Sequence, residues 1–160
     1  MKLLVPLDGS AASAHALNHA LWLAEQRPGA LLILLNVQNA ETLDLSDVMR
    51  GKGEALAAQA SEEVFEKPVA RCRVLHTRCE ARAEYGPVAE TLDRIARETQ
   101  ADQIVMGTRG LGRLRGLLLG SVATQVVHLT DIPVTLVKEQ GVAVKSQFEV
   151  TNWSEAPAIA

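Results

Sequence analysis

The sequence is poor in cysteine and aromatic residues, and it lacks a long apolar stretch. Cysteine occurs twice, and aromatic residues make up 3 % of the 160 residues. The longest apolar run covers residues 30–35, and a membrane-spanning helix needs about 20 residues, so we expect no membrane contact. The apolar run over residues 3–7 is interrupted from Asp8 onward, which argues against a signal peptide.

Two cysteines are too few for a disulfide framework. If Cys72 and Cys79 lie on one strand, they are about 23 Å apart, at roughly 3.3 Å per residue, and on opposite faces. A disulfide needs Cα atoms within about 7 Å of each other. We therefore expect two free thiols in a reducing compartment, which is typical of a cytoplasmic protein.

The charge balance is weakly acidic. Sixteen Lys and Arg against nineteen Asp and Glu leave a formal net charge of −3. General nucleic-acid binding depends on neutralising phosphates, so this composition argues against it. Apolar residues make up 48 % of the chain, which is enough for a buried core, and the length fits one domain of roughly 100–200 residues.

Five apolar segments predict five β-strands. Four are near-continuous aliphatic runs, the pattern of strands buried on both faces of a parallel sheet. The third alternates apolar and charged residues from Leu75 to Glu84, which is typical of a half-exposed edge strand. The predicted strands are, in chain order, Lys2–Leu7, Leu31–Val37, Val74–Ala83, Gln103–Met106 and Pro133–Val137.

Helical periodicity occupies the segments between these strands. Apolar residues recur at helical spacing over residues 10–26, in a second helix up to about Phe65, after Pro87, and over residues 121–129. Residues 40–46 are predicted to form a loop. Strands that alternate with helices predict a doubly wound α/β sandwich, whose ligands lie beyond the carboxyl ends of the strands where the winding reverses.

The C-terminal segment after residue 138 allows two interpretations. Apolar and polar residues alternate over residues 142–150, which fits either a short sixth strand or a loosely held extension. The sequence from Thr151 is typical of irregular coil. Trp153 packs either on the body of the protein or on a partner.

A glycine-rich segment follows the fourth predicted strand. Five of the eleven glycines lie between Gly107 and Gly120, and a predicted helix begins at Ser121. Glycine allows a ligand to come close to the backbone, and a helix N-terminus directs free N–H groups toward an anion. This arrangement suits a ligand that carries phosphate. It is no Walker loop, which needs a lysine before Ser121, and a dinucleotide fingerprint fails because Arg115 replaces its last glycine.

The spacing within this segment resembles a family signature. The segment has the pattern G-x2-G-x9-G-[S/T], formed by Gly107, Gly110, Gly120 and Ser121. This pattern is similar to the nucleotide-binding signature of the universal stress protein family. Val5–Ser10 resembles the family's first strand and turn, and Ile132–Val134 resembles the start of its last strand. The resemblance covers about residues 2–138, so residues 1–138 are expected to form the family's domain and residues 139–160 a C-terminal extension.

The resemblance implies a fold and a ligand. The fold is an α/β three-layer sandwich with a five-stranded parallel sheet in the order 3-2-1-4-5, similar to that of adenine nucleotide alpha hydrolases. The ligand is ATP, or AMP, with Mg²⁺ held through the phosphates. Carried over to this sequence, the implied site has three groups: Pro6, Leu7 and Asp8 near adenine and ribose; Val37 and Met106 beside the base; and Gly107, Gly110, Gly120, Ser121 and Val122 at ribose and phosphates, mostly through backbone N–H groups.

The resemblance also implies partners. It predicts a homodimer through the strand Pro133–Val137 and a sensor or regulatory role in the stress response. In that role, bound nucleotide orders the loop Gly107–Gly120 and changes the surface seen by a protein partner whose identity is unknown. Asn36 stands where the family commonly has histidine, which we expect to alter the polarity of the pocket.

Several polar residues allow two interpretations. Asp8 either contacts the ligand or caps the first helix through an Asx turn, and both can hold together. Arg109, Arg113 and Arg115 either clamp phosphates or are solvated on a loop. His15 and His19 have the spacing of a metal pair but no third ligand nearby in sequence, so a surface pair is expected.

No catalytic constellation is visible in the sequence. It shows neither a Ser/His/Asp set in a known order nor two carboxylates placed for acid–base work. Slow ATP hydrolysis would then be incidental, and an enzyme acting on a small phosphorylated substrate is the less favoured interpretation. The alternative of another class is a dimeric adaptor of the same fold that holds no nucleotide.

Overall fold

The computed structural model describes residues 1–39, 52–110 and 119–138. Strands and helices alternate along these residues, as the sequence predicts. The strands are β1 (Lys2–Pro6), β2 (Leu31–Gln38), β3 (Arg78–Tyr85), β4 (Gln103–Gly107) and β5 (Val134–Val137). The helices are α1 (Ala11–Glu25), α3 (Gly53–Val74), α4 (Val88–Glu98) and α5 (Ser121–Leu129).

The five strands form one parallel sheet in the order β3-β2-β1-β4-β5. This confirms the predicted order and the α/β fold class. β1 lies at the centre, since Leu4 is in register with Ile33 of β2 and with Ile104 of β4. The winding reverses between β1 and β4, so the carboxyl ends of these two strands mark the place where such sheets bind ligands.

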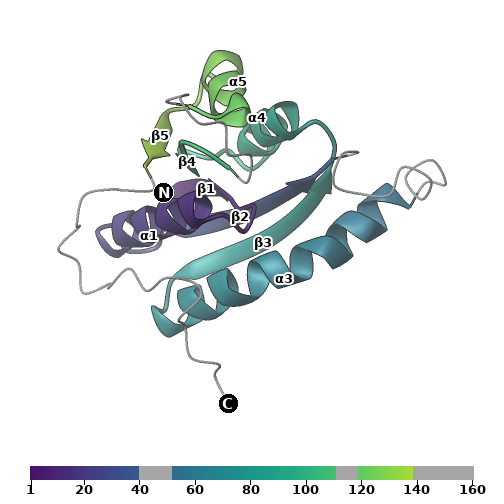
Figure 1. Cartoon of the computed structure of the whole chain (residues 1–160). Coiled ribbons are helices and arrows are strands. Elements are labelled where there is room, and N and C mark those ends of the chain that lie inside the picture. Colours follow the sequence, from purple (N-terminus) through teal and green to yellow (C-terminus); the bar gives the residue numbers. More distant parts are fainter. Residues whose placement is uncertain (40–51, 111–118, 139–160) are drawn as a thin grey trace.

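The sheet is covered on both faces, which gives three layers (Figure 1). α1 and α3 pack on one face and α4 and α5 on the other. Successive β1 residues belong to different cores: Leu3 and Val5 face α1 and α3, whereas Leu4 faces α4 and α5. All three are fully buried. Burial on both faces explains why the strand sequences are continuous aliphatic runs rather than alternating ones.

α3 and β3 differ in extent from the prediction. The helix continues to Val74 instead of ending near Phe65, and β3 begins at Arg78 instead of Val74. Pro68 lies inside the helix, yet the apolar spacing continues beyond it, because Val69 and Cys72 pack against the core of this face. Tertiary packing therefore carries the helix through a residue that disfavours helix interiors.

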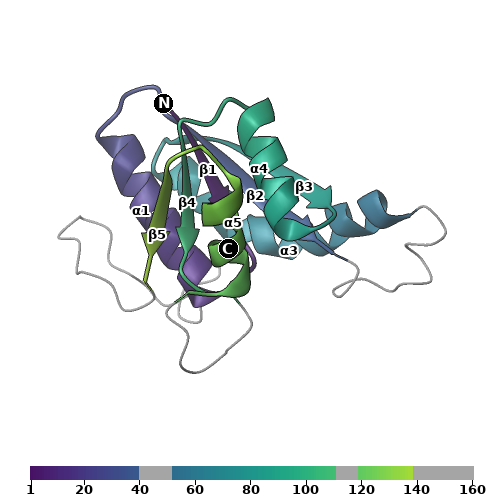
Figure 2. The ribbon, with the colours of Figure 1, turned by 90° about the horizontal axis from the view of Figure 1, so that it is seen from above.

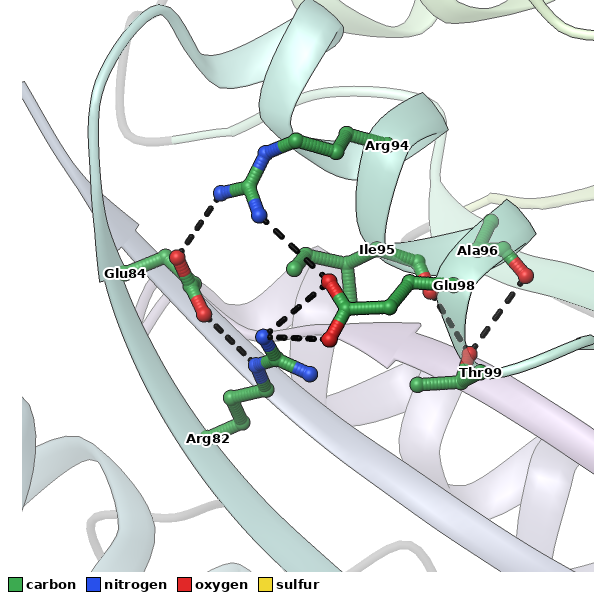
Figure 3. A network of polar contacts seen from close by, with 7 residues as sticks. All are labelled: Arg82, Glu84, Arg94, Ile95, Ala96, Glu98 and Thr99. Atoms are coloured by element: carbon green, nitrogen blue, oxygen red, sulfur yellow. Dashed lines mark hydrogen bonds and ion pairs between the residues drawn. The ribbon is translucent and has the colours of Figure 1, made fainter.

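β3 is an edge strand, as predicted, but its alternation does not separate buried from exposed residues. Ala81 is exposed, whereas Arg82 and Glu84 are partly buried. A network of ion pairs explains this (Figure 3): the Arg82 guanidinium contacts Glu84 at 2.5 Å and Glu98 of α4 at 3.1 Å. Arg94 of α4 contacts Glu84 at 2.8 Å and Glu98 at 3.5 Å.

This network holds α4 against the edge of the sheet. Burial raises the pKa of the Glu84 carboxyl, but hydrogen bonds from Arg94 and Arg82 outweigh burial and leave the pKa below its ordinary value. Charged side chains on an edge strand also discourage pairing with another sheet.

Three predictions lie outside the described residues: the loop at 40–46, the C-terminal extension 139–160 with Trp153, and the roles of Arg113 and Arg115. None of the described helices combines the length and the apolar character that crossing a membrane requires.

Candidate functional site

A cavity of about 280 Å³ opens at the carboxyl ends of β1 and β4, at the low end of the roughly 300–1,000 Å³ range for small-molecule pockets. It lies on the face covered by α4 and α5, two helices that lie side by side over the sheet (Figures 1 and 2). The point where the winding of the sheet reverses therefore carries a preformed concave site.

All ten residues proposed from the sequence line this cavity. They are Pro6, Leu7, Asp8, Val37, Met106, Gly107, Gly110, Gly120, Ser121 and Val122. The structure brings them together from four separate parts of the chain.

Eight further lining residues were not among the predicted site residues. They are Ser13, Leu35, Asn39, Val88, Leu92, Arg109, Leu119 and Ala123. The helical spacing of Val88 and Leu92 predicts that both face the sheet, but it does not tell a cavity wall from a filled core. Only the packing of α4 beyond the end of β4 makes that distinction.

One part of the cavity is an apolar slot. Leu35 and Val37 from β2 and Met106 from β4 form its floor, and Val88 and Leu92 from α4 complete it. Leu35 and Leu92 are fully buried. A slot of this composition suits a flat, largely apolar group such as an aromatic ring.

Asp8 forms the turn between β1 and α1. Its Oδ1 accepts hydrogen bonds from the Ser10 amide at 3.0 Å and from the Ser10 hydroxyl at 2.5 Å. Ser10 is the N-cap of α1 and accepts a bond from the Ser13 amide at 3.1 Å. The Asx-turn interpretation of Asp8 is therefore correct, and Asp8 also lines the cavity.

The second oxygen of Asp8 lies close to the glycine-rich segment. A Cβ atom built on Gly110 would be 2.6 Å from Asp8 Oδ2. Glycine at this position thus lets the loop after β4 approach the carboxylate that ends β1. The polar end of the cavity is formed where these two segments meet.

The N-terminus of α5 supplies backbone donors. Its N-cap is Gly120, whose own N–H donates to the Thr108 carbonyl at 2.7 Å. The Thr124 amide is the first to donate within the helix, to the Gly120 carbonyl at 3.0 Å, so the amides of residues 121–123 have no acceptor within the helix. These three residues line the cavity. The Ser121 and Val122 amides therefore have no acceptor within the helix, whereas the Gly120 amide is already paired.

Gly107 is required for packing. A Cβ atom at this position would lie 2.8 Å from Ala12 Cβ and 2.9 Å from the Ala12 backbone carbon. The N-terminal turn of α1 therefore touches the end of β4 directly. The sequence suggests ligand approach as the reason for this glycine, but contact between two elements of the fold explains it without a ligand.

Asn36 does not face the cavity, so the expected effect on pocket polarity is wrong. Its side chain is buried and donates to the Leu7 carbonyl at 2.5 Å. Its Oδ1 accepts from Gln38 Nε2 and from the Ser61 hydroxyl of α3, both at 2.7 Å. Neighbouring β2 residues point to opposite faces, and Leu35 and Val37 line the cavity, so Asn36 faces α3.

The candidate metal pair on α1 has no further support. The His19 ring stacks on Trp22 with 5.6 Å between ring centres, and burial lowers the pKa of His19. Within the described parts of the chain, no three acidic, histidine or cysteine side chains are grouped as metal ligands would be.

Comparisons with known proteins place the chain among relatives of one kind. It is 32 % identical over 149 residues to universal stress protein YxiE of Bacillus subtilis (strain 168), covering 86 % of this chain and 98 % of the relative. The fold is similar to that of hypothetical protein MJ0577, with a TM-score of 0.78, 23 % identity and coverage of 88 % of this chain and 97 % of the other.

Two other similar structures are complexes of universal stress proteins. One contains cAMP, with a TM-score of 0.62, 24 % identity and coverage of 87 % and 97 %. The other, from Archaeoglobus fulgidus, contains dAMP, with a TM-score of 0.62, 20 % identity and coverage of 86 % and 98 %. A sequence profile described as "Universal stress protein family" matches residues 1–138. This chain therefore belongs to the universal stress protein family.

Proposed function

We propose that this protein binds an adenine nucleotide, ATP in the first place, in the cavity at the ends of β1 and β4. One observation carries the proposal: the residues of the apolar slot and the unpaired amides at the N-terminus of α5 line the same cavity. A ligand that fills both parts needs a flat ring at one end and an anion at the other, and a nucleotide has both.

Each part of a nucleotide has a counterpart in the lining. The base fits between Val37 and Met106, and the carboxylate of Asp8 is an acceptor for ribose hydroxyls. The amides of residues 121–123 and the positive end of the α5 dipole favour phosphate. Arg109, which also lines the cavity, adds a charge of the right sign. Two structural neighbours, bound to cAMP and dAMP, support adenine as the base.

Mg²⁺ would be bound together with the phosphates. Asp8 is the only carboxylate among the described lining residues, and Mg²⁺ in nucleotide sites is held by one or two carboxylates plus phosphate oxygens. The donor set fits this role, with Asp8 as the protein ligand. The ion would supply neutralisation of the phosphate charge, and the protein residues would hold and orient the nucleotide.

The proposed role is regulatory rather than enzymatic. Nucleotide occupancy changes the surface around Gly107–Gly120, a protein partner in the stress response reads that change, and the cytoplasm, where ATP is abundant, is the place of action. Limited proteolysis with and without ATP and Mg²⁺ tests this part. We expect cleavage within this segment to slow when nucleotide is present, and equal cleavage rates contradict the regulatory role.

The proposal includes a homodimer through residues 133–137. β5 is an edge strand whose four residues are all only partly buried. The Pro133 and Val137 carbonyls pair with β4, so the backbone groups of Val134 and Leu136 face outward. Apolar edges of this kind are usually covered. Light scattering over a concentration series should give twice the mass of the chain, and a monomer at every concentration contradicts the dimer.

A thermal-shift titration with ATP, AMP and GTP tests nucleotide binding. At 100 times the dissociation constant a ligand stabilises the folded state by about 2.7 kcal/mol, which raises the melting temperature by roughly 5–10 °C for a chain of this size. We expect this shift with an adenine nucleotide and a smaller one with GTP. The nucleotide-free adaptor instead predicts no shift with any nucleotide and an intact dimer.

A pair of matched variants locates the site. Val88→Trp puts a large ring into the cavity wall and should abolish the shift. Val127→Trp makes the same change on α5, at a residue that is 45 % exposed and lies outside the cavity lining, and should keep the shift. Equal shifts in both variants contradict binding in this cavity.

A further inference from the structure

The only two cysteines of the chain meet across the turn between α3 and β3. Cys72 lies in the last turn of α3 and is fully buried, and Cys79 is the second residue of β3 and is partly buried. Both side chains pack in the same core, between the sheet and the layer of α1 and α3. The expectation of a wide separation is wrong, because the two residues lie on different elements rather than on one strand.

The turn explains how the thiols come together. The His76 amide donates to the Arg73 carbonyl at 3.1 Å, and the Thr77 amide donates to the Cys72 carbonyl at 2.9 Å. His76 adopts a left-handed conformation with φ of 52°, which turns the chain back along the helix. The strand therefore returns past the last turn of α3, which places the Cys79 side chain beside Cys72 in the same core.

We propose that Cys72 and Cys79 form a reversible intramolecular disulfide when the protein meets a peroxide. The bond would join the C-terminal turn of α3 to the edge strand β3, two elements that are already packed together. It is a covalent modification site, separate from the nucleotide cavity and independent of the proposed function, since neither cysteine lines that cavity.

The reaction has two balanced steps. The Cys79 thiolate attacks one oxygen of hydrogen peroxide, the O–O bond breaks, hydroxide leaves and Cys79 becomes a sulfenic acid. Cys72 then attacks the sulfur of that sulfenic acid, the S–O bond breaks, and water leaves with the proton of the Cys72 thiol. The peroxide is reduced by two electrons and the two thiols are oxidised by two, and a dithiol reductant reverses the change.

Burial and charge set the order of these steps. Cys72 has no exposed surface, so peroxide reaches Cys79 first. Burial, together with the neighbouring Cys79 thiol, raises the pKa of Cys72 to about 12, so Cys72 stays protonated and unreactive in the reduced protein. Once Cys79 is a sulfenic acid, its electrophilic sulfur lies beside Cys72, whose thiol proton leaves with the water in the second step.

The test is intact mass spectrometry of the full chain after reduction, removal of the reductant and treatment with hydrogen peroxide. We expect a monomer lighter by two hydrogen atoms, in which N-ethylmaleimide labels neither cysteine until a dithiol reductant is added. Closing an eight-residue loop should also raise the melting temperature reversibly, by roughly 5–10 °C.

Two single variants separate the roles of the thiols. Cys72→Ala leaves Cys79 without its partner, so a sulfenic acid should accumulate there and be trapped by dimedone. In Cys79→Ala, peroxide should leave the buried Cys72 unmodified. Because Cys79 is only partly buried, this variant still tests the proposal if Cys72→Ala is too unstable to purify. Three results for the wild-type protein would overturn the proposal. Peroxide could leave both thiols intact, it could leave a sulfenic acid at Cys79 that dimedone labels, or it could form disulfides only between two chains.

Discussion

The contact between Gly107 and Ala12 gives a sharp prediction about the glycines of the family signature. In Gly107→Ala the new methyl group would lie 2.8 Å from Ala12 Cβ and 2.9 Å from a backbone atom, so α1 or β4 must move. Overpacking of this kind costs about 1–3 kcal/mol. Alanine also lowers the conformational entropy of the unfolded chain, which stabilises the folded state by about 0.4–1 kcal/mol and offsets part of this cost. The expected net loss is about 1–2 kcal/mol, which lowers the melting temperature by roughly 2–8 °C.

Gly120→Ala is the matched control, because it makes the same chemical change in the same segment. Its Cβ would lie 3.4 Å from its nearest neighbours, which is ordinary contact, and its φ of −73° suits any residue. The smaller preference for alanine at an N-cap offsets the gain from the unfolded state. We expect a change within about 0.5 kcal/mol.

Urea unfolding of the two variants, followed by circular dichroism, measures the difference. A lower midpoint with an unchanged slope for Gly107→Ala, and no change for Gly120→Ala, is the expected result. Equal stability of the two variants would refute the packing explanation and leave ligand approach as the reason for Gly107.

Three other predictions concern hydrogen bonds, charge and the site. Asn36→Ala removes the partner of the buried Leu7 carbonyl and should cost about 2–4 kcal/mol in urea unfolding; an unchanged midpoint contradicts this. Glu84→Gln should destabilise the protein above pH 4.5, the ordinary pKa of the carboxyl. Because the folded-state pKa is lower, this difference should vanish as the pH falls through it, and a difference that stays constant down to the lowest pH contradicts the role of Glu84. Gly110→Ala should displace the Asp8 carboxylate and weaken the ATP thermal shift with little loss of stability; an undiminished shift contradicts a role for Asp8.

The sheet could be predicted from the sequence because its strands are buried on both faces. In Leu31–Val37, for example, the first polar residue is Asn36, so residues for both faces of the strand are apolar up to that point. This pattern is typical of central strands in parallel sheets. The strand order followed from the resemblance, and the alternating charges of the third strand independently indicated an edge. Both agree with the structure.

The end of α3 was predicted wrongly because the apolar pattern around it is ambiguous. Helical spacing was traced only to about Phe65 and the apolar pair Val74–Leu75 was assigned to a strand, but packing of Val69 and Cys72 against the core continues the helix, which ends at Val74. The same error separated the two cysteines. Contacts between elements that are distant in space decide such boundaries, and a periodic pattern does not contain them.

The lining of the site was predicted where the chain ends a strand or begins a helix, as at Asp8 and Ser121. Sequence spacing locates these positions because tight turns and helix N-termini favour particular residues, such as Asp, Ser and Gly. It missed Val88 and Leu92, whose apolar character serves a cavity wall and a filled core equally well. The side chain of Asn36 contacts Ser61 because α3 packs on that face of the sheet, and the sequence around Asn36 does not indicate this contact.

The most direct test of the central claim is isothermal titration calorimetry of the full chain with ATP and Mg²⁺, with GTP titrated in parallel. If the slot and the amides of α5 hold an adenine nucleotide, ATP gives a saturable heat with one site per chain and GTP binds more weakly. No heat with any adenine nucleotide, at concentrations up to those in a cell, contradicts the account.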